Sequence, residues 1–323
     1  MHTLLQQLHH WRLGMAEPQP LELPDRAVVN RRYQILCQLG QGSVERTYLA
    51  ADAFYQNQWC VLKEFVPRLL NPRALAAGRE RFEQEVSLLR DLDHPQLPGF
   101  REVLECQFGG LNRWIVVQEW LEGMSYHDLV KSRPFTEVEA IAFLQDMLPA
   151  LNYLHQQEPA VIHGNLSLET ILQSTEMGKP ILINFGTLKH IALCIADPYA
   201  EPVPPRLRLY RPPEQLKGQL NPTADLYALA VTVLGMLTGC ADPREFFDRR
   251  TQTWCWAEHV AVSVGLVVIL DRMLHPDPTQ RYQSGGEVQA ALVAIHSRLP
   301  VPKPQPVFCP VGHPRSLHPV RWS

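Results

Sequence analysis

The sequence lacks the patterns that mark secreted and membrane proteins. Its seven cysteines are odd in number and widely spaced, and no two form a C-x-x-C pair, which is typical of free thiols in a reducing compartment. Residues 1–15 are polar and lack the apolar stretch of a signal peptide. The longest apolar run, residues 260–270, is too short to cross a bilayer and predicts a buried helix. We therefore expect a cytoplasmic protein without membrane contact.

A strong charge of either sign is also missing. Lys and Arg number 30 against 33 Asp and Glu, which gives a formal net charge of −3. This balance offers no electrostatic reason to expect a nucleic acid as partner. The hydrophobic share of 46% over 323 residues is that of a globular protein with a packed core.

Both ends of the chain differ from its middle. Residues 1–29 form an N-terminal extension, and residues 298–323 form a tail whose many prolines prevent a regular helix. Cys309, His313 and His318 lie in this tail without a fourth ligand, so a zinc site is not expected there. Residues 30–297 remain as the domain.

The middle of the chain predicts two lobes. Strand patterns dominate up to residue 120 and occur at Tyr33–Leu39, Thr47–Ala50, Trp59–Phe65, Phe100–Phe108 and Trp114–Glu119. One helix, Ala74–Leu92, interrupts them. Helices follow at Thr136–His155, Ala224–Leu237, Val260–Leu274 and Ser284–Ile295. The expected fold is α+β, with a five-stranded N-lobe (30–120) that carries one helix and a larger helical C-lobe (121–297). A ligand would sit between the lobes.

Two features of the N-lobe suggest a phosphate-binding cleft. Gly40 and Gly42 lie between two strands, where a tight turn can bring backbone N–H groups to phosphate oxygens, although a plain hairpin turn has the same pattern. Lys63 lies among apolar strand residues, and a buried cation needs a partner. Glu85, on the inward side of the following helix, is the candidate partner.

With these features in order, the chain resembles the eukaryotic-type Ser/Thr protein kinase superfamily, in particular its bacterial branch. The resemblance covers roughly residues 30–297 and rests on segments in family order: 39–48, 60–65, 93–98, 118–123, 161–165, 183–186, 210–215, 225–229 and 275–282. It implies a kinase fold with ATP as the candidate cofactor. Adenine would contact the hinge at Glu119 and Leu121, above an apolar pocket from Val61, Leu172 and Ile183.

The catalytic positions depart from the family. Asn165 stands where the family has its catalytic Asp, while Thr170 and Asn184 replace the two metal ligands. An amide cannot take a proton from a substrate, and losing a positioned base costs about 10²–10⁴ in rate. Mg²⁺ favours anionic oxygen, so a neutral amide and a hydroxyl make a poor replacement and Mg²⁺ binding is doubtful. The chain is thus identified as a degenerate member, a pseudokinase.

Two further departures agree with this. Glu45 replaces the third glycine of the loop and would repel a triphosphate. Gly164 replaces the arginine that grips a phosphorylated activation segment, so phosphate-driven ordering of residues 187–210 is not expected.

The residues that keep their family identity have structural roles in the resemblance. The stack that joins the lobes would consist of Leu89, Phe100, His163 and Phe185. Asp225 would anchor the catalytic loop through backbone N–H groups, and Glu214 would pair with Arg281. His163 is expected to pack rather than to act as a base.

Nucleotide binding stays open. Lys63, Glu85 and the loop glycines favour it, but the first two also form a sensible structural ion pair that braces the helix. Glu45 and the lost metal ligands oppose it, so the expected form is weak or metal-independent. In a second alternative, Glu45 or Glu169 substitutes for a missing carboxylate.

The leading functional hypothesis is a catalytically inactive regulatory or scaffolding module that binds protein partners. The alternatives are a weak Ser/Thr kinase or another ATP-dependent transferase, and an adaptor that works through its two ends. The segment Trp254–Trp256 is either core or an exposed patch for a partner.

Overall fold

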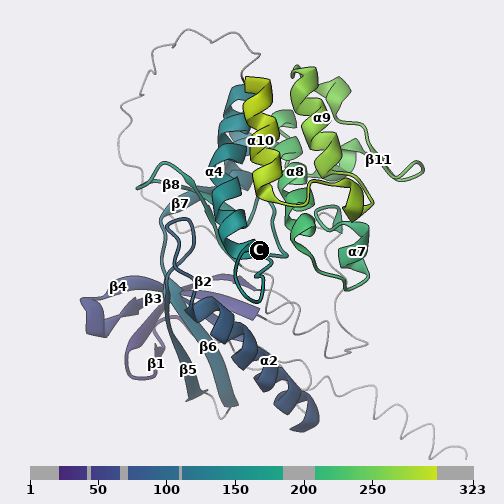
Figure 1. Cartoon of the computed structure of the whole chain (residues 1–323). Helices are drawn as coiled ribbons and strands as arrows, with labels where there is room; N and C mark the ends of the chain where they lie inside the picture. The colour runs from purple at the N-terminus through teal and green to yellow at the C-terminus, as the bar shows by residue number, and fades with distance from the viewer. Residues whose placement is uncertain (1–21, 42–44, 66–71, 109–110, 185–207, 297–323) are drawn as a thin grey trace, which may run out of the picture.

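The computed structural model describes residues 22–41, 45–65, 72–108, 111–184 and 208–296. They form a small lobe built on a sheet and a larger helical lobe (Figure 1). This confirms the predicted α+β, two-lobed architecture. Most of the N-terminal extension and the whole tail lie outside the described residues. Within them, no helix is long and apolar enough to cross a membrane.

The small lobe is built on an antiparallel sheet with the strand order β1-β2-β3-β4-β6-β5. Its strands are β1 (Val28–Val29), β2 (Tyr33–Gln41), β3 (Glu45–Asp52), β4 (Gln58–Phe65), β5 (Phe100–Phe108) and β6 (Leu111–Glu119). The five predicted strands are all present. The sequence missed β1, which makes the sheet six-stranded, because two residues are too few to show an alternating pattern.

Alternation along the central strands separates the two faces of this sheet. On β4, Val61, Lys63 and Phe65 face the cleft side, opposite Gln118, Val116 and Trp114 of β6. Helix α2 (Pro72–Arg90) covers part of this inner face, where its Phe82 and Val86 pack against Phe65, Val116 and Trp114.

A charged cluster is buried on the outer face of the sheet. Glu64 forms an ion pair with Arg113, and both side chains are about 1% exposed. Arg46 lies 4.0 Å from the other Glu64 oxygen, and the Tyr48 hydroxyl donates to that oxygen at 3.3 Å. Burial raises the pKa of Glu64, and the charge of Arg113 opposes this shift.

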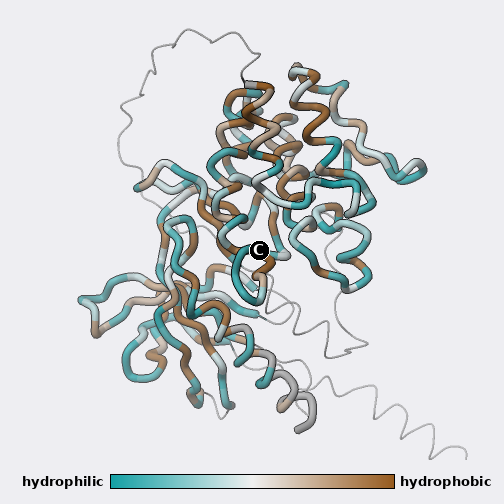
Figure 2. The backbone as a smooth tube through the Cα atoms, viewed as in Figure 1, coloured by the Kyte–Doolittle hydropathy of each residue, from teal (hydrophilic) through white to brown (hydrophobic). Residues whose placement is uncertain are grey.

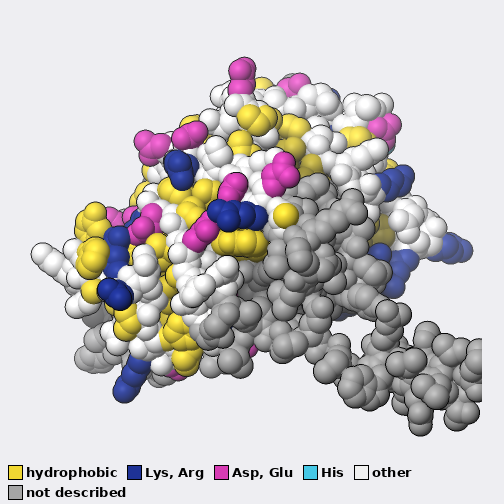
Figure 3. Space-filling view, turned by 90° about the horizontal axis from the view of Figure 1, so that it is seen from below, with side chains coloured by type: hydrophobic (Ala, Val, Ile, Leu, Met, Phe, Trp, Pro, Cys, Tyr) yellow, Lys and Arg dark blue, Asp and Glu magenta, His cyan; other side chains and the backbone are white. Residues whose placement is uncertain are grey.

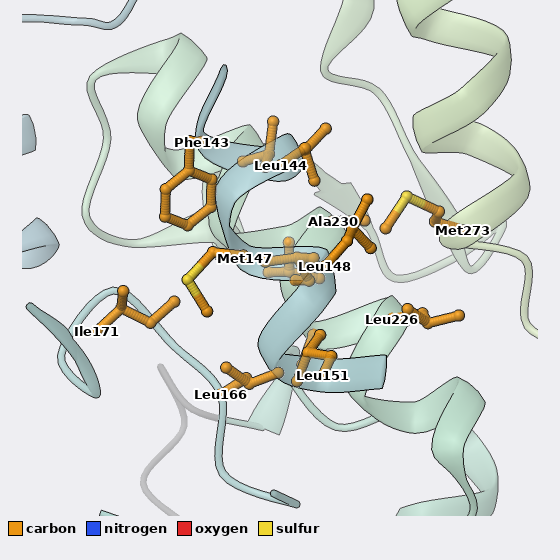
Figure 4. Close-up of a cluster of buried hydrophobic side chains, with 14 of the residues drawn as sticks. Phe143, Leu144, Met147, Leu148, Leu151, Leu166, Ile171, Leu226, Ala230 and Met273 are labelled. Atoms are coloured by element: carbon orange, nitrogen blue, oxygen red, sulfur yellow. The ribbon is translucent and has the colours of Figure 1, made fainter. Parts of the chain in front are cut away.

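The large lobe packs around one buried helix. Its helices are α3 (Tyr126–Ser132), α4 (Glu137–His155), α7 (Pro213–Leu216), α8 (Pro222–Thr238), α9 (Val264–Met273) and α10 (Gly285–His296), with 3₁₀ turns at Pro243–Phe246, Ala257–His259 and Pro278–Gln280. Helix α8 is buried on every side from Thr223 to Leu237, in line with its all-round apolar sequence (Figure 2). Figure 4 shows α4 side chains such as Leu148 and Leu151 directed towards Leu226 and Ala230 of α8.

Short strands complete the large lobe. The strands β10 (Phe247–Asp248) and β11 (Thr253–Trp254) form a hairpin. The strands β7 (Gly123–Ser125), β8 (Ile171–Ser174) and β9 (Pro180–Leu182) form a small sheet on the large-lobe side of the cleft. After the hairpin, Trp256 is buried and donates from Nε1 to Asp271 at 3.0 Å, while Trp254 donates to the Tyr227 hydroxyl at 3.2 Å. Trp256 therefore belongs to the core, and the patch alternative is wrong for it. Trp254 is partly buried and packs against the same core.

Capping explains where the predicted helices begin. The capping box of Thr136 and Glu139 on α4 is confirmed. Helix α9 starts four residues later than predicted because the Ser263 side chain accepts from the N–H of Leu266, which fixes the first turn there. At α10, the Glu287 carboxylate accepts a hydrogen bond from the N–H of Gln283 rather than from that of Ser284.

One buried amide joins the lobes behind the cleft. Gln96, between α2 and β5, donates from Nε2 to the carbonyls of Asp146 on α4 and Pro180 on β9, each at 2.8 Å. Its own carbonyl accepts from the N–H of Leu182 at 2.9 Å. These bonds fix the segment that follows α2 to the large lobe.

Candidate functional site

A cavity that opens to solvent lies between the lobes, and the space within it, open solvent included, is about 330 Å³. The small lobe lines it with Thr47, Val61 and Lys63, with Pro98 from the loop before β5, and with Gln118 and Glu119 from the end of β6. Trp120 and Leu121 follow β6, and the large lobe contributes Leu172, Ile183 and Asn184. Of the predicted pocket residues, Val61, Lys63, Glu119, Leu121 and Leu172 are all brought together here.

Gln118 is a cavity residue that the sequence analysis did not single out. It is 3% exposed and faces the cleft opposite Val61. Among the described residues its carboxamide makes no hydrogen bond, although it lines the cavity. The sequence could have shown this, because Trp114, Val116 and Gln118 alternate along β6 and so place a polar side chain on its inner face.

The hinge that follows is held from outside the cavity. The N–H of Glu119 donates to the carbonyl of Gly99 at 2.8 Å, and the N–H of Gly99 donates to the Glu119 carboxylate at 3.2 Å. Trp120 packs edge-on against Trp59, with ring centroids 6.1 Å apart. The Glu119 carboxylate and N–H are thus both used by the neighbouring loop.

The polar groups of β3 and β4 lie next to each other at the inner end of the cavity. Lys63 is 8% exposed and pairs across the ladder with Thr47. The Thr47 hydroxyl donates to the Glu45 carboxylate at 3.2 Å. Glu45 therefore sits beside the cavity wall, on the same face of the sheet as Lys63.

Two predicted site residues of this region lie outside the part of the chain that the structure describes. They are Gly42 and the side chain of Glu85, so the Lys63–Glu85 ion pair stays a prediction. Gly40 is placed at the end of β2, where it pairs with Thr47.

The residues at the catalytic and metal positions bond to one another. Asn165 donates from Nδ2 to the backbone carbonyl of Asn184 at 3.1 Å. The Thr170 hydroxyl donates to the carbonyl of Asn165 at 2.8 Å and accepts from the N–H of Ser167 at 2.9 Å. The side chain of Thr170 is thus used inside its own loop.

The donor set at these positions does not fit Mg²⁺. Asn184 has the left-handed backbone conformation, with φ of 57°, which asparagine tolerates better than most residues. It offers a neutral amide, as does Asn165, and Thr170 offers a hydroxyl, whereas Mg²⁺ favours carboxylates and phosphates. Within the described part of the chain, no group of three His, Cys, Asp or Glu is arranged to hold a metal ion.

The loop around Asn165 is anchored from below by Asp225 on α8. One Asp225 oxygen accepts from the N–H of Gly164 and the other from the N–H of His163, both at 2.8 Å. His155 donates from Nε2 to the second oxygen at 2.9 Å. Gly164 has φ of 66°, where a residue with a Cβ would be strained. This backbone geometry suits the loss of the family arginine at that position.

His163 is fully buried and uses both ring nitrogens. Its Nε2 lies 3.1 Å from the carbonyl of Ile183, so this nitrogen carries the proton, and Nδ1 accepts from the N–H of Asn165 at 3.4 Å. A ring bonded in this way has no lone pair left for a substrate. It connects the catalytic loop to the strand that leads to Asn184.

The remaining structural residues lie on either side of this loop. Leu89 and Phe100 pack against the large-lobe core, while Phe185 lies outside the described residues. In the large lobe, Arg281 donates twice to Glu214, at 2.6 and 3.0 Å, and both side chains are buried.

This architecture matches a known family. A model of the protein kinase domain matches residues 33–292. The chain belongs to the protein kinase domain family. The kinase scaffold accounts for the two lobes, the cavity between them and the loop anchored by Asp225.

Curated relatives of this kinase domain are bacterial Ser/Thr kinases. Serine/threonine-protein kinase C of Synechocystis sp. is 30% identical over 284 residues, which cover 85% of this chain and 52% of the relative. Serine/threonine-protein kinase B of Synechocystis sp. is 31% identical over 82% of this chain and 46% of the relative. Serine/threonine-protein kinase PknA of Nostoc sp. is 29% identical over 86% of this chain and 50% of the relative. The chain spans about half the length of these relatives.

Solved structures support the fold. The PknI kinase domain of Mycobacterium tuberculosis has a TM-score of 0.63 and 20% identity, and the match covers 85% of this chain and 99% of that domain. The structure titled PpkA-294 apo form has a TM-score of 0.66 and 22% identity, with 84% and 99% covered.

Proposed function

We propose that this kinase domain is a pseudokinase: it does not transfer phosphate and serves as a regulatory or scaffolding module. The observation that carries the proposal is the bond from Asn165 to the carbonyl of Asn184, together with the inward bond of Thr170. The positions that would hold a base and two metal ligands carry neutral side chains, and those of Asn165 and Thr170 stabilise the loops.

The chemistry of phosphate transfer explains why these positions matter. The reaction needs a carboxylate that positions the attacking hydroxyl and metal ions that neutralise the phosphates. Loss of the base alone costs about 10²–10⁴ in rate. The structural supports, by contrast, remain: Asp225 under the loop and the Glu214–Arg281 pair in the large lobe.

Protein partners remain part of the proposal. Phe54 and Tyr55, at the turn between β3 and β4, are 73% and 61% exposed. Both rings lie next to the Arg32 guanidinium, which Asp52 holds with two bonds of 2.7 Å. Aromatic and Arg side chains of this kind are enriched in protein interfaces. Figure 3 shows hydrophobic side chains gathered on the small-lobe side of the face seen from below.

A second candidate is a weakly active Ser/Thr kinase or another ATP-dependent transferase. The buried Lys63 in the cavity wall and the names of the relatives favour it.

Phosphate transfer from labelled ATP to the chain itself and to generic protein substrates, with Mg²⁺ or Mn²⁺, tests the proposal. The natural chain and its Lys63→Met variant should both give no signal. A variant with Asn165→Asp, Thr170→Asn and Asn184→Asp serves as the matched control that restores the family residues. If the natural chain transfers phosphate and the Lys63→Met variant does not, the pseudokinase proposal is wrong and the second candidate is favoured.

A further inference from the structure

A second hollow lies within the large lobe, between the catalytic loop and the segment that leads into α7. The space within it, open solvent included, is about 280 Å³. Its polar lining comes from Gly164, Asn165 and Ser167 of the loop, from Arg211 and Gln215, and from Asp225 on α8. Gln215 donates from Nε2 to the carbonyl of Gly164 at 2.8 Å and so fixes the segment to the loop. This hollow shares no lining residue with the cavity between the lobes.

Arg211 brings an unpaired charge to the hollow. Its side chain is half-buried and forms no hydrogen bond or ion pair with the described residues. Burial lowers the pKa of Arg211, and no carboxylate opposes this shift. Among the described residues that line the hollow, Asp225 is the one acid, and its oxygens already accept from the N–H groups of His163 and Gly164 and from His155. A guanidinium that loses water without gaining an anion is unfavourable, and an incoming carboxylate relieves this cost.

The same segment carries two further cations. Arg208 and Lys217 are exposed, and neither forms an ion pair with the part of the chain that the structure describes. The acid between them in sequence, Glu214, is buried and bonded twice to Arg281, so its charge is already compensated. Leu216, next to Lys217, is 49% exposed. We call the surface formed by Arg208, Arg211, Leu216 and Lys217 the 208–217 surface.

We propose that the 208–217 surface is a docking site for an acidic segment of a partner protein. One carboxylate of that segment binds Arg211 in the hollow, where the planar guanidinium fork offers two bonds, and an apolar side chain packs beside Leu216. The three cations are spread along one segment rather than gathered at one point, which suits a run of carboxylates better than a single phosphate. This inference rests on the proposed regulatory or scaffolding function, because it names the kind of partner that such a module binds.

Fluorescence anisotropy of the full chain with a labelled peptide tests the site. The probe is a short peptide of glutamates around a central leucine, and its control carries glutamines in place of the glutamates. The glutamate peptide should bind at least about tenfold more tightly than the glutamine peptide. Added salt should weaken its binding, because salt screens exposed charges. Equal binding of the two peptides overturns the proposal.

The role of Arg211 is tested by removing its charge. Arg211→Gln should weaken binding of the glutamate peptide about tenfold, and Arg211→Lys should recover only part of the loss, because an ammonium lacks the planar fork. Arg211 has no partner to lose, so thermal unfolding of Arg211→Gln should match that of the natural chain. Lys217→Gln, at an exposed position, should weaken binding about two- to threefold, whereas Arg31→Gln, at an exposed turn of the small lobe, is the control and should change nothing. Unchanged binding in Arg211→Gln contradicts the proposal.

A third peptide separates a carboxylate from a phosphate. Phosphoserine in place of one glutamate should leave the affinity within about threefold, and a gain of more than about tenfold shows that the occupant is a phosphorylated segment and overturns the proposal. These binding tests are distinct from the transfer assay. A glutamate peptide that does not bind overturns this inference and leaves the pseudokinase proposal standing, whereas phosphate transfer to protein substrates overturns the pseudokinase proposal even where the peptide binds through Arg211.

Discussion

The side-chain amide of Asn165 donates to the backbone carbonyl of Asn184, 3.1 Å away, and so ties the catalytic loop to the loop that would hold the metal. An aspartate at position 165 has no donor when ionised and cannot make this bond. The asparagine that stands in place of the family aspartate therefore makes a contact that an ionised aspartate cannot form.

This contact predicts that Asn165→Asp destabilises the protein. The ionised carboxylate would face the Asn184 carbonyl without a proton between them, at a cost of about 1 kcal/mol. Thermal unfolding at neutral pH should show a midpoint lower by a few degrees. The deficit should shrink near pH 3, where a protonated carboxyl can donate. Asn112→Asp, on exposed β6 surface, is the control. Equal stability of Asn165→Asp at neutral pH would contradict the contact.

Asp225→Ala should be among the most destabilising single changes in the large lobe. It leaves the buried N–H groups of His163 and Gly164 without an acceptor, at about 1–3 kcal/mol each. Denaturation by urea should show this loss, and Asp225→Asn should lose less because its carbonyl keeps one acceptor. If both variants unfold at the same urea concentration as the natural chain, Asp225 is not an anchor.

Because Glu214 and Arg281 form a buried ion pair, we expect the stability losses of their single variants not to add up in the double variant. Removing one partner, as in Glu214→Leu, leaves a buried charge unpaired and should cost about 3–5 kcal/mol. The double variant Glu214→Leu with Arg281→Met removes both charges and should recover much of that loss. Urea denaturation of the two single variants and the double variant measures the coupling, and simple addition of the single losses would argue against a buried pair.

Glu139 predicts a pH-dependent contribution to stability. A hydrogen bond from Arg133, with others from Thr136, lowers the pKa of Glu139 to about 2. A carboxyl with a depressed folded-state pKa stabilises the fold above its unfolded value and loses this effect as pH falls. Stability should therefore decline between about pH 5 and pH 2. The Glu139→Gln variant should show a smaller decline over that interval in thermal unfolding, and an identical decline would exclude Glu139 as a cause.

The sequence predicted the fold well where local pattern and packing agree. The strands of the small lobe are short runs rich in apolar and aromatic residues, and α8 is apolar all round, so both were found. Strand β1 was missed because Val28–Val29 is stabilised by pairing with β2 rather than by a pattern of its own. Helix α9 was placed too early because the apolar run continues before Ser263, whose side chain sets the start.

The site was predictable as a set of positions but not as a set of contacts. Motif order placed Val61, Lys63, Leu121 and Leu172 around one cavity. It could not show that Thr170 turns its hydroxyl into its own loop, nor that the amide of Gln118 makes no hydrogen bond to the described residues, because both depend on the path of the backbone.

The two bonds from Gln96 to the carbonyls of Asp146 and Pro180 have a mechanical consequence. The segment after α2 is bonded to the large lobe, although it belongs in sequence to the small one. If the sheet tilts against the large lobe, we expect the rotation to centre on this segment. The far end of α2 would then travel furthest, and the residues next to Gln96 least.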